Sequence, residues 1–316
     1  MPPDWFCRAP HPPTVAFAAR CASEAMSVFR SPCDRLVLNN GVSLPWLGHA
    51  LHGQPGPMAV ERAVSAALEA GCRSFHADLD EAGDSAWANA LRASGLARGE
   101  LFLSIGSGGG KQGYAQTRES FERRLDRLGL ETLDLCLLDA SPASRFLDAW
   151  QALEELHGEA RVRAIGLRGF PMQALRELLG ACDVRPALNQ IELHPLAPHK
   201  SLRQFCAAQN LQLRALPPLP GRRRAPPSAL LALAERHGCS AAQIAQRWCL
   251  QRDLPVLTEE TDPALLRRAG EVFDFHLDPD ELALLDALAP DAVSEAPRGL
   301  LRLLPGMRRR AVATAA

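Results

Sequence analysis

The segment Leu133–Leu167, which reads LDLCLLDASPASRFLDAWQALEELHGEARVRAIGL, decides the fold of this chain. Its two ends, Leu133–Leu138 and Val162–Leu167, are short apolar runs typical of parallel strands that are buried on both faces. Between them, Ala143–Leu156 repeats its apolar residues at helical spacing. The segment therefore predicts a strand, a helix and a second strand parallel to the first.

The same alternation continues on both sides of this unit. Further strands are expected at Arg73–Ala77, Leu101–Ile105, Ala187–Leu193, Gln212–Leu216 and Pro255–Thr258, with one more within Val42–Leu47. Helices are expected at Met58–Ala70, Ala86–Ser94, Thr117–Leu128, Met172–Ala181, Leu202–Gln209 and Ala241–Gln251. Eight strands that alternate with helices over about 250 residues predict a (β/α)8 TIM barrel.

A doubly wound parallel sheet is the competing fold, and it is disfavoured by its missing motif. That fold would place a GxGxxG turn after an early strand, and no such turn is present. The glycines of Gly106–Gly110 do follow an expected strand, but Lys111 and Gln112 do not complete a phosphate-binding loop. The glycine stretch is interpreted as a loop between a strand and a helix.

Composition and charge exclude several classes of protein. The chain has 316 residues, of which 47% are hydrophobic and 22% charged, as in an average soluble globular protein. No run approaches the roughly 20 apolar residues of a membrane span. The net charge of −1 disfavours nucleic acid as the main partner. We expect a disordered extension over residues 1–34, a barrel over 35–290 and a C-terminal tail over 291–316.

The cysteines indicate a reducing compartment. There are nine of them, an odd number, and no pair has CxxC spacing. This pattern predicts reduced thiols, with neither a disulfide framework nor a metal site. Because no basic segment precedes a leader-like apolar run, we expect the protein in the cytoplasm.

Seven ordered blocks resemble the aldo-keto reductase family, in particular its bacterial members similar to 2,5-diketogluconate reductase. The most specific is NQIELHP, which spans Asn189–Pro195. The other blocks are LNNGV at 38–42, ALEAG at 67–71, LGL at 128–130 with DL at 134–135, RAIG at 163–166, AQ at 242–243 with RW at 247–248, and VFDF at 272–275. The resemblance extends from about residue 36 to residue 290. It implies the (β/α)8 fold, a monomer, and reduction of aldehydes and ketones by hydride from NADPH.

The resemblance also implies a catalytic tetrad of Asp, Tyr, Lys and His at the ends of barrel strands. Those four positions fall on His76, Glu81, Gly106 and Asp139, so all four are replaced. The chain has only one tyrosine, Tyr114, and two lysines, Lys111 and Lys200, and none of these lies at the required place. The family's acid, which protonates the carbonyl oxygen as hydride arrives, is therefore expected to be missing.

The cofactor positions implied by the resemblance are altered as well. Gln190, which helps to hold the nicotinamide amide, is kept. The positions of the Ser-Asn pair, the stacking aromatic ring and the adenosine-phosphate grip are occupied by Arg168, Gly169, Leu216, Glu259, Glu260, Leu265 and Ala269. The two carboxylates at the phosphate position would repel a 2′-phosphate at close range.

These substitutions predict a barrel that has lost NADPH-dependent reduction and binds an unidentified small molecule or protein partner, with no cofactor. Two alternatives stay open. One is a divergent NAD(P)H-dependent reductase of aldehydes or ketones with an atypical site. The other is a repurposed, non-redox barrel enzyme that uses His76, Asp139 and Glu81, although no metal-ligand spacing is present.

Overall fold

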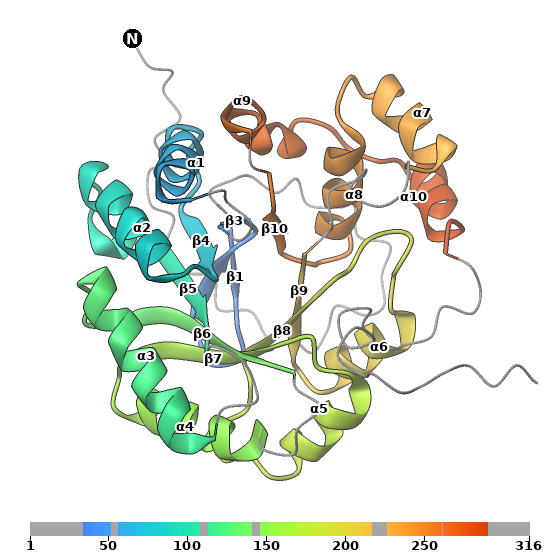
Figure 1. Ribbon diagram of the computed structural model, residues 1–316. Coiled ribbons are helices and arrows are strands. Elements are labelled where there is room, and N and C mark those ends of the chain that lie inside the picture. The colour runs from blue at the N-terminus through green and yellow to red at the C-terminus, as the bar shows by residue number, and fades with distance from the viewer. Residues whose placement is uncertain are drawn as a thin grey trace, which may run out of the picture.

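Eight parallel strands form a closed barrel (Figure 1). The computed structural model describes residues 34–51, 56–107, 113–140, 146–216, 226–260 and 262–289. The barrel strands are β3 (Leu47–Ala50), β4 (Ser74–Ala77), β5 (Phe102–Gly106), β6 (Leu133–Asp139), β7 (Val162–Arg168), β8 (Leu188–Ile191), β9 (Gln212–Ala215) and β10 (Val256–Thr258). Each pairs with its sequence neighbour, and β10 pairs with β3 to close the ring. The predicted (β/α)8 barrel is confirmed.

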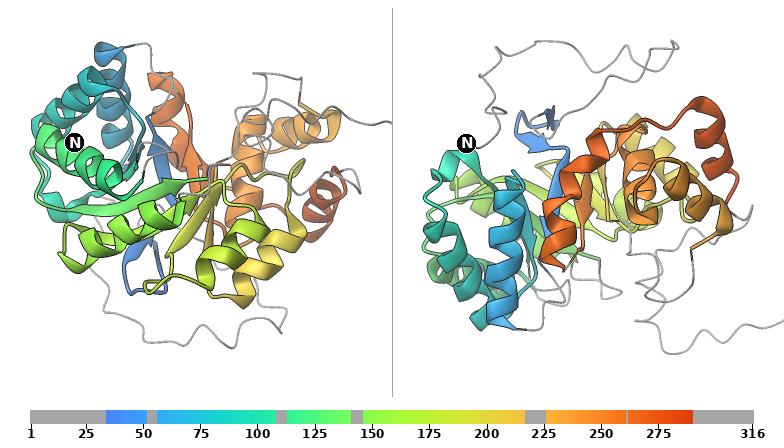
Figure 2. Two further views of the ribbon diagram at one scale, coloured as in Figure 1. Left: turned by 60° about the horizontal axis from the view of Figure 1, so that its bottom comes forward. Right: turned by 90° about the horizontal axis from the view of Figure 1, so that it is seen from above.

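Helices surround the barrel on its outside, as the views in Figures 1 and 2 show. They are α1 (Pro57–Glu69), α2 (Glu81–Ala93), α3 (Tyr114–Leu128), α4 (Phe146–Gly158), α5 (Met172–Leu179), α6 (Lys200–Ala208), α7 (Ser228–Arg236), α8 (Ala241–Leu250), α9 (Pro263–Arg267) and α10 (Pro279–Asp286), with short 3-10 turns at Arg98–Glu100 and Ala269–Phe273. Their apolar faces pack on the strands and bury the helical tryptophans Trp87, Trp150 and Trp248. No helix in the described part of the chain is long and apolar enough to cross a membrane.

The expected strand within Val42–Leu47 is wrong as a barrel strand. Ser43–Pro45 forms β2, which pairs antiparallel with β1 (Arg35–Val37), and the first barrel strand begins only at Leu47. Pro45 explains the difference, since proline lacks the N–H that a central strand needs and is confined to strand edges. The predicted extension, apart from Asp34, and the predicted tail lie outside the described residues.

The β1–β2 hairpin closes the N-terminal end of the barrel. Leu38, Val42 and Leu44 are buried there in one apolar cluster with Phe102, Leu135, Leu137, Ala164, Ala187 and Leu188. The turn is fixed by side-chain amides, since Asn39 Nδ2 donates to the carbonyl oxygens of Pro186 and Asn210, and Asn40 Nδ2 to that of Arg163. The C-terminal ends of the strands are thus left as the end at which a site can form.

Gly166 tests how tightly the barrel interior is packed. A Cβ at this position would lie 2.9 Å from the Leu188 carbonyl oxygen and 3.0 Å from Leu137 Cδ2. Because the carbonyl belongs to the neighbouring strand and cannot rotate away, we expect Gly166→Ala to lower the free energy of unfolding by about 1–3 kcal/mol in urea denaturation.

The matched control is Gly158→Ala at the end of α4, where a Cβ would meet nothing within 4 Å. This variant should be neutral or stabilised by up to about 1 kcal/mol, because alanine is the better helix former. Equal stability of the two variants would contradict the packing assigned to the barrel interior.

Candidate functional site

Four side chains on adjacent strands form a polar row at the C-terminal end of the barrel. The strand register pairs Asp139 of β6 with Arg168 of β7, Arg168 with Gln190 of β8, and Gln190 with Arg214 of β9. Side chains alternate along a strand, so these residues share the inward face with Leu137 of β6 and Leu188 of β8, which are buried in the apolar cluster beneath the hairpin. We call Asp139, Arg168, Gln190 and Arg214 the mouth row.

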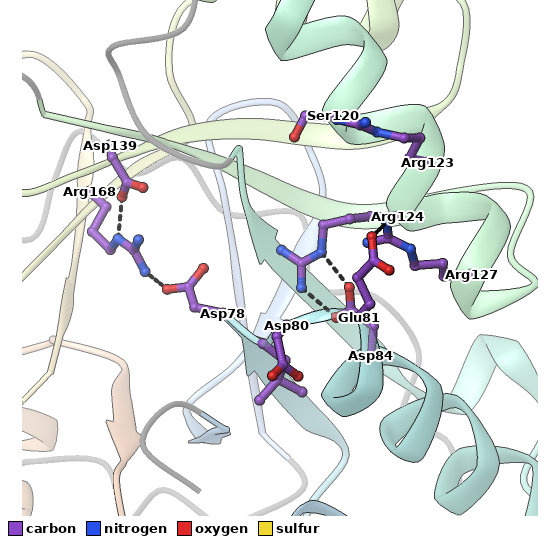
Figure 3. Close-up of a pocket in the computed structure, with 11 residues that line it drawn as sticks. Asp78, Asp80, Glu81, Asp84, Ser120, Arg123, Arg124, Arg127, Asp139 and Arg168 are labelled. Carbon is purple, nitrogen blue, oxygen red and sulfur yellow. Dashed lines mark hydrogen bonds and ion pairs between the residues drawn. The ribbon is translucent and has the colours of Figure 1, made fainter. Parts of the chain in front are cut away.

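Arg168 is the centre of an ion-pair network in the barrel mouth (Figure 3). Its guanidinium forms ion pairs with Asp139 and with Asp78, which follows β4. Its Nη1 also lies 3.3 Å from His76 Nε2. Both carboxylates are largely buried, with 26% and 20% of the Asp78 and Asp139 side chains exposed. One guanidinium therefore compensates two partly desolvated carboxylates.

His76 is held in place from both sides. Its Nδ1 lies 3.1 Å from Ser104 Oγ of β5, and its Nε2 lies 3.6 Å from Asp78 Oδ2. The Ser104 hydroxyl donates to the Phe75 carbonyl oxygen, so it accepts a hydrogen bond from the ring when Nδ1 is protonated. The ring is fully buried. His76 is thus part of the Arg168 network and has no exposure to solvent.

Gly106 makes room for this network. A Cβ built on Gly106 would collide with the Asp78 carboxylate and would lie 3.3 Å from Arg168 Nη2. The side chains of Asp78 and Arg168 therefore occupy the space in front of the last residue of β5. Any larger residue at position 106 requires both to move.

Burial shifts the titration of the mouth row. It raises the pKa of the Asp139 carboxyl to about 7, even though that carboxyl contacts the Arg168 guanidinium. Burial also lowers the pKa of Arg168 to about 10. Asp139 is therefore partly protonated near neutral pH, whereas Arg168 keeps its charge.

Arg214 and Gln190 form a second, deeper pair. Arg214 is 1% exposed, and its Nε and Nη2 donate to Gln190 Oε1 at 3.0 and 2.5 Å. Burial, and to a smaller extent the nearby charge of Arg168, lower the pKa of Arg214 to about 9. Within the described residues, Arg214 Nη1 and Gln190 Nε2 have no hydrogen-bond partner.

A cavity of about 560 Å³ opens beside the network, between the segment after β4 and helix α3. Its lining is mostly charged, as Figure 3 shows, and Ser120 and Leu79 are the uncharged residues in it. Arg124 closes its floor by pairing with the buried Asp84 and donating to the carbonyl oxygens of Ala77 and Gly106. Glu81 pairs with Arg127 of α3 and is 77% exposed, so its carboxylate lies on the outer rim of the cavity.

The predicted site residues thus lie in four places. His76, Gly106, Asp139, Arg168 and Gln190 meet at the strand ends, whereas Glu81 is turned toward α3. Gly169 follows Arg168 with a φ of +74°, a left-handed conformation that favours glycine, and Leu216 directly follows β9. Glu259, Glu260, Leu265 and Ala269 lie beyond β10, in and around α9.

The charged side chains described here for the segment beyond β10 are carboxylates, or arginines that already form ion pairs with carboxylates. Glu259 and Glu260 are half-buried, and the Asp262 side chain caps α9 by accepting from the Ala264 N–H. The two arginines of this segment already have partners, because Arg267 pairs with Glu69 and Arg268 pairs with Glu271.

Sequence reasoning missed Arg214 and Ser104. The signal for Arg214 was present: it stands two residues before Leu216 in a buried strand, so the alternation of side chains assigns both to the same face. Ser104 had no comparable signal, since a serine in an apolar strand is unremarkable until a histidine is found beside it.

The raised pKa of Asp139 has a consequence for stability. Because the folded state holds the Asp139 proton more tightly than the unfolded chain, that contribution to stability is complete below about pH 4 and is lost as the pH rises through about 7. Asp139→Asn removes the titration, so the free energy of unfolding of the wild type should fall relative to that of the variant between these pH values. Each unit of pKa difference corresponds to about 1.4 kcal/mol.

The measurement is urea denaturation of both proteins at half-unit steps across this window. A difference between wild type and Asp139→Asn that stays constant with pH would show that Asp139 does not titrate in this range.

Comparisons with known proteins agree with the (β/α)8 fold described above. The aldo/keto reductase family model matches residues 52–290. The chain is 33% identical over 258 residues to a glyoxal reductase of Bacillus subtilis, covering 82% of this chain and 94% of that protein. It is also 33% identical to a 9,11-endoperoxide prostaglandin H2 reductase of Trypanosoma cruzi, over 81% and 92% of the two chains.

The crystal structure of an aldo/keto reductase from Brucella melitensis superimposes with a TM-score of 0.76 at 30% identity. The match covers 84% of this chain and 99% of that chain. The family model and the relatives both span the strands that carry the mouth row, so the chain belongs to the aldo/keto reductase family.

Proposed function

We propose that this chain is a member of its family that does not reduce carbonyl compounds with NADPH and that uses the barrel mouth to bind a different ligand. The observation that carries the proposal is the ion-pair network of Arg168 with Asp78 and Asp139. It fills the mouth with paired charges at the level where the family resemblance assigns the catalytic groups and the nicotinamide.

The first support for the proposal concerns the acid that would have to protonate a carbonyl oxygen. Hydride transfer to a carbonyl builds negative charge on its oxygen, and a positioned acid must neutralise that charge. Glu81, at the position of the family's tyrosine, is exposed and paired with Arg127. Gly106, at the position of the lysine, has no side chain. His76 is already engaged by Ser104 and Arg168.

The cofactor also fits this chain poorly. Gln190 Oε1, which would receive the nicotinamide amide, accepts two hydrogen bonds from Arg214 instead. At the other end of the cofactor, a 2′-phosphate would meet Glu259 and Glu260, and the nearby Arg267 and Arg268 are occupied by carboxylates. Bringing a phosphate to these groups sets like charges against each other.

A second candidate function is non-redox acid–base catalysis by His76 and Asp139. It is favoured by the raised pKa of Asp139, about 7, at the edge of a cavity, because perturbed carboxyls of this kind often serve as general acids or bases. Glu81 does not join this group in the fold.

The free thiols of the buried Cys136, Cys206 and Cys249 fit the cytoplasmic location that we propose for either function.

Cofactor titration tests the proposal. Wild-type protein is titrated with NADPH and NADP⁺ to millimolar concentration, with thermal unfolding and tryptophan fluorescence as readouts. A cofactor at 100-fold excess over its Kd would stabilise the native state by about 2.7 kcal/mol, so binding of that strength is easily detected. We expect no saturable shift for the wild type.

The matched variant is Glu259→Lys combined with Glu260→Ser, which places a cation and a hydroxyl where the family resemblance assigns the adenosine-phosphate grip. It should bind NADPH more tightly than the wild type if charge is the obstacle there. Both proteins are then assayed for NADPH oxidation with glyoxal, because a relative is named a glyoxal reductase. Saturable cofactor binding together with glyoxal-dependent turnover by the wild type would overturn the proposal in favour of a divergent reductase.

A further inference from the structure

We propose that Arg214 and Gln190 form a binding site for a small oxyanion, a carboxylate or phosphate group, inside the barrel mouth. This inference names the class of ligand for the function proposed above and rests on that function. It depends on two buried donors on neighbouring strands that lack acceptors among the described residues, and on the balance of charge around them.

The first observation is the pair of unsatisfied donors. Arg214 and Gln190 are 1% and 0% exposed, and their side chains are joined through Gln190 Oε1. That contact uses two of the three nitrogen atoms of the guanidinium and leaves Arg214 Nη1 without a partner among the described residues. It also fixes the amide so that Gln190 Nε2 faces away from the guanidinium, and this nitrogen has no partner either.

The second observation is the absence of a countercharge. Within the described residues, no carboxylate forms an ion pair with Arg214. The two carboxylates of the mouth, Asp78 and Asp139, are both engaged by Arg168. A buried guanidinium without a carboxylate is far more costly than a buried neutral group, because its hydration is lost and nothing replaces it.

The charge of the whole mouth points to an anion. Two guanidiniums face two carboxylates, and burial raises the pKa of one of these, Asp139, to about 7. Arg214, with a pKa of about 9, remains protonated at neutral pH. The four charged side chains Arg168, Arg214, Asp78 and Asp139 therefore carry net positive charge when Asp139 is protonated.

An oxyanion satisfies both requirements at once. Its charge compensates Arg214, and its two or more oxygen atoms can accept from Arg214 Nη1 and Gln190 Nε2. The register of β8 and β9 sets the two residues side by side, so one small group can reach both.

The test uses the full chain and three probes: sodium acetate, disodium malonate and inorganic phosphate, each against sodium chloride at the same ionic strength. Thermal unfolding and isothermal titration calorimetry are the readouts. We expect at least one probe to give a saturable rise in Tm, of about 5 °C or more at 100-fold excess over Kd, that chloride does not give. Acetate and malonate against phosphate separate a carboxylate ligand from a phosphate ligand.

Arg214→Gln should lose this response, and Arg214→Lys should keep part of it, because the charge remains while the guanidinium fork is lost. The control is Arg62→Gln, which removes one positive charge from the exposed face of α1. It should respond as the wild type does. Gln190→Leu, which retains the cation, should weaken binding without abolishing it.

Stability without added anion separates a ligand site from a structural contact. Arg214→Gln should then have a Tm equal to or above that of Arg62→Gln, since it removes a buried charge that lacks a countercharge. The inference is overturned if no probe shifts the wild type, or if Arg214→Gln and wild type respond equally. It is also overturned if Arg214→Gln is less stable without anion and no probe binds, which would assign Arg214 a purely structural role. NADPH binding is measured separately, so either proposal can fail alone.

Discussion

Closure of the barrel is the constraint on which the rest of this structure depends. Because β10 pairs with β3, inward-facing side chains have no open sheet edge through which to reach water. The β1–β2 hairpin fills the N-terminal end with Leu38, Val42 and Leu44. An inward-facing charge can therefore be accommodated only near the C-terminal end, and it needs partners there. The ion pairs of Arg168 with Asp78 and Asp139 meet that need.

The same constraint links the fold to the function that we propose. Arg168 at the end of β7 forms ion pairs with Asp78 and Asp139 in the mouth. In the function that we propose, these paired charges occupy the place that a neutral cofactor ring and a reacting carbonyl would need. Arg214, one strand beyond Gln190, has no such carboxylate among the described residues. In the mouth, two carboxylates thus compensate the charge of Arg168, whereas the charge of Arg214 is left for an anion to compensate. The electrostatics of the mouth row therefore differ between its two ends, although it spans only four strands.

The sequence predicted the barrel well because apolar strand runs and helical spacing are local signals. The predicted boundaries of individual helices and strands were wrong where a different local signal acted. Helix α2 begins at Glu81, five residues before the apolar periodicity starts at Ala86, because the Asp80 side chain caps it by accepting from the Gly83 N–H. Pro45 turned an expected barrel strand into an edge hairpin. The aldo/keto reductase family was likewise recognisable from its ordered motifs.

The contacts of the site were less predictable. Arg168 and Asp78 are 90 positions apart, and they meet only because four strands of a closed ring bring their ends together. The turning of Glu81 toward Arg127 depends on how α2 packs beside α3, which no spacing within either helix encodes. Residues that converge through barrel geometry can be assigned to a face from sequence, but their partners follow only from the assembled ring.

Gly106 couples three positions of the mouth that are far apart in the sequence. The Asp78 carboxylate lies where a Cβ at position 106 would be, and Arg168 Nη2 lies 3.3 Å from the same point. A side chain added at position 106 would displace the Asp78 carboxylate and with it one of the two ion pairs of Arg168. Substitutions at positions 78, 106 and 168 are therefore expected to be non-additive, because each changes the space or the charge on which the other two depend.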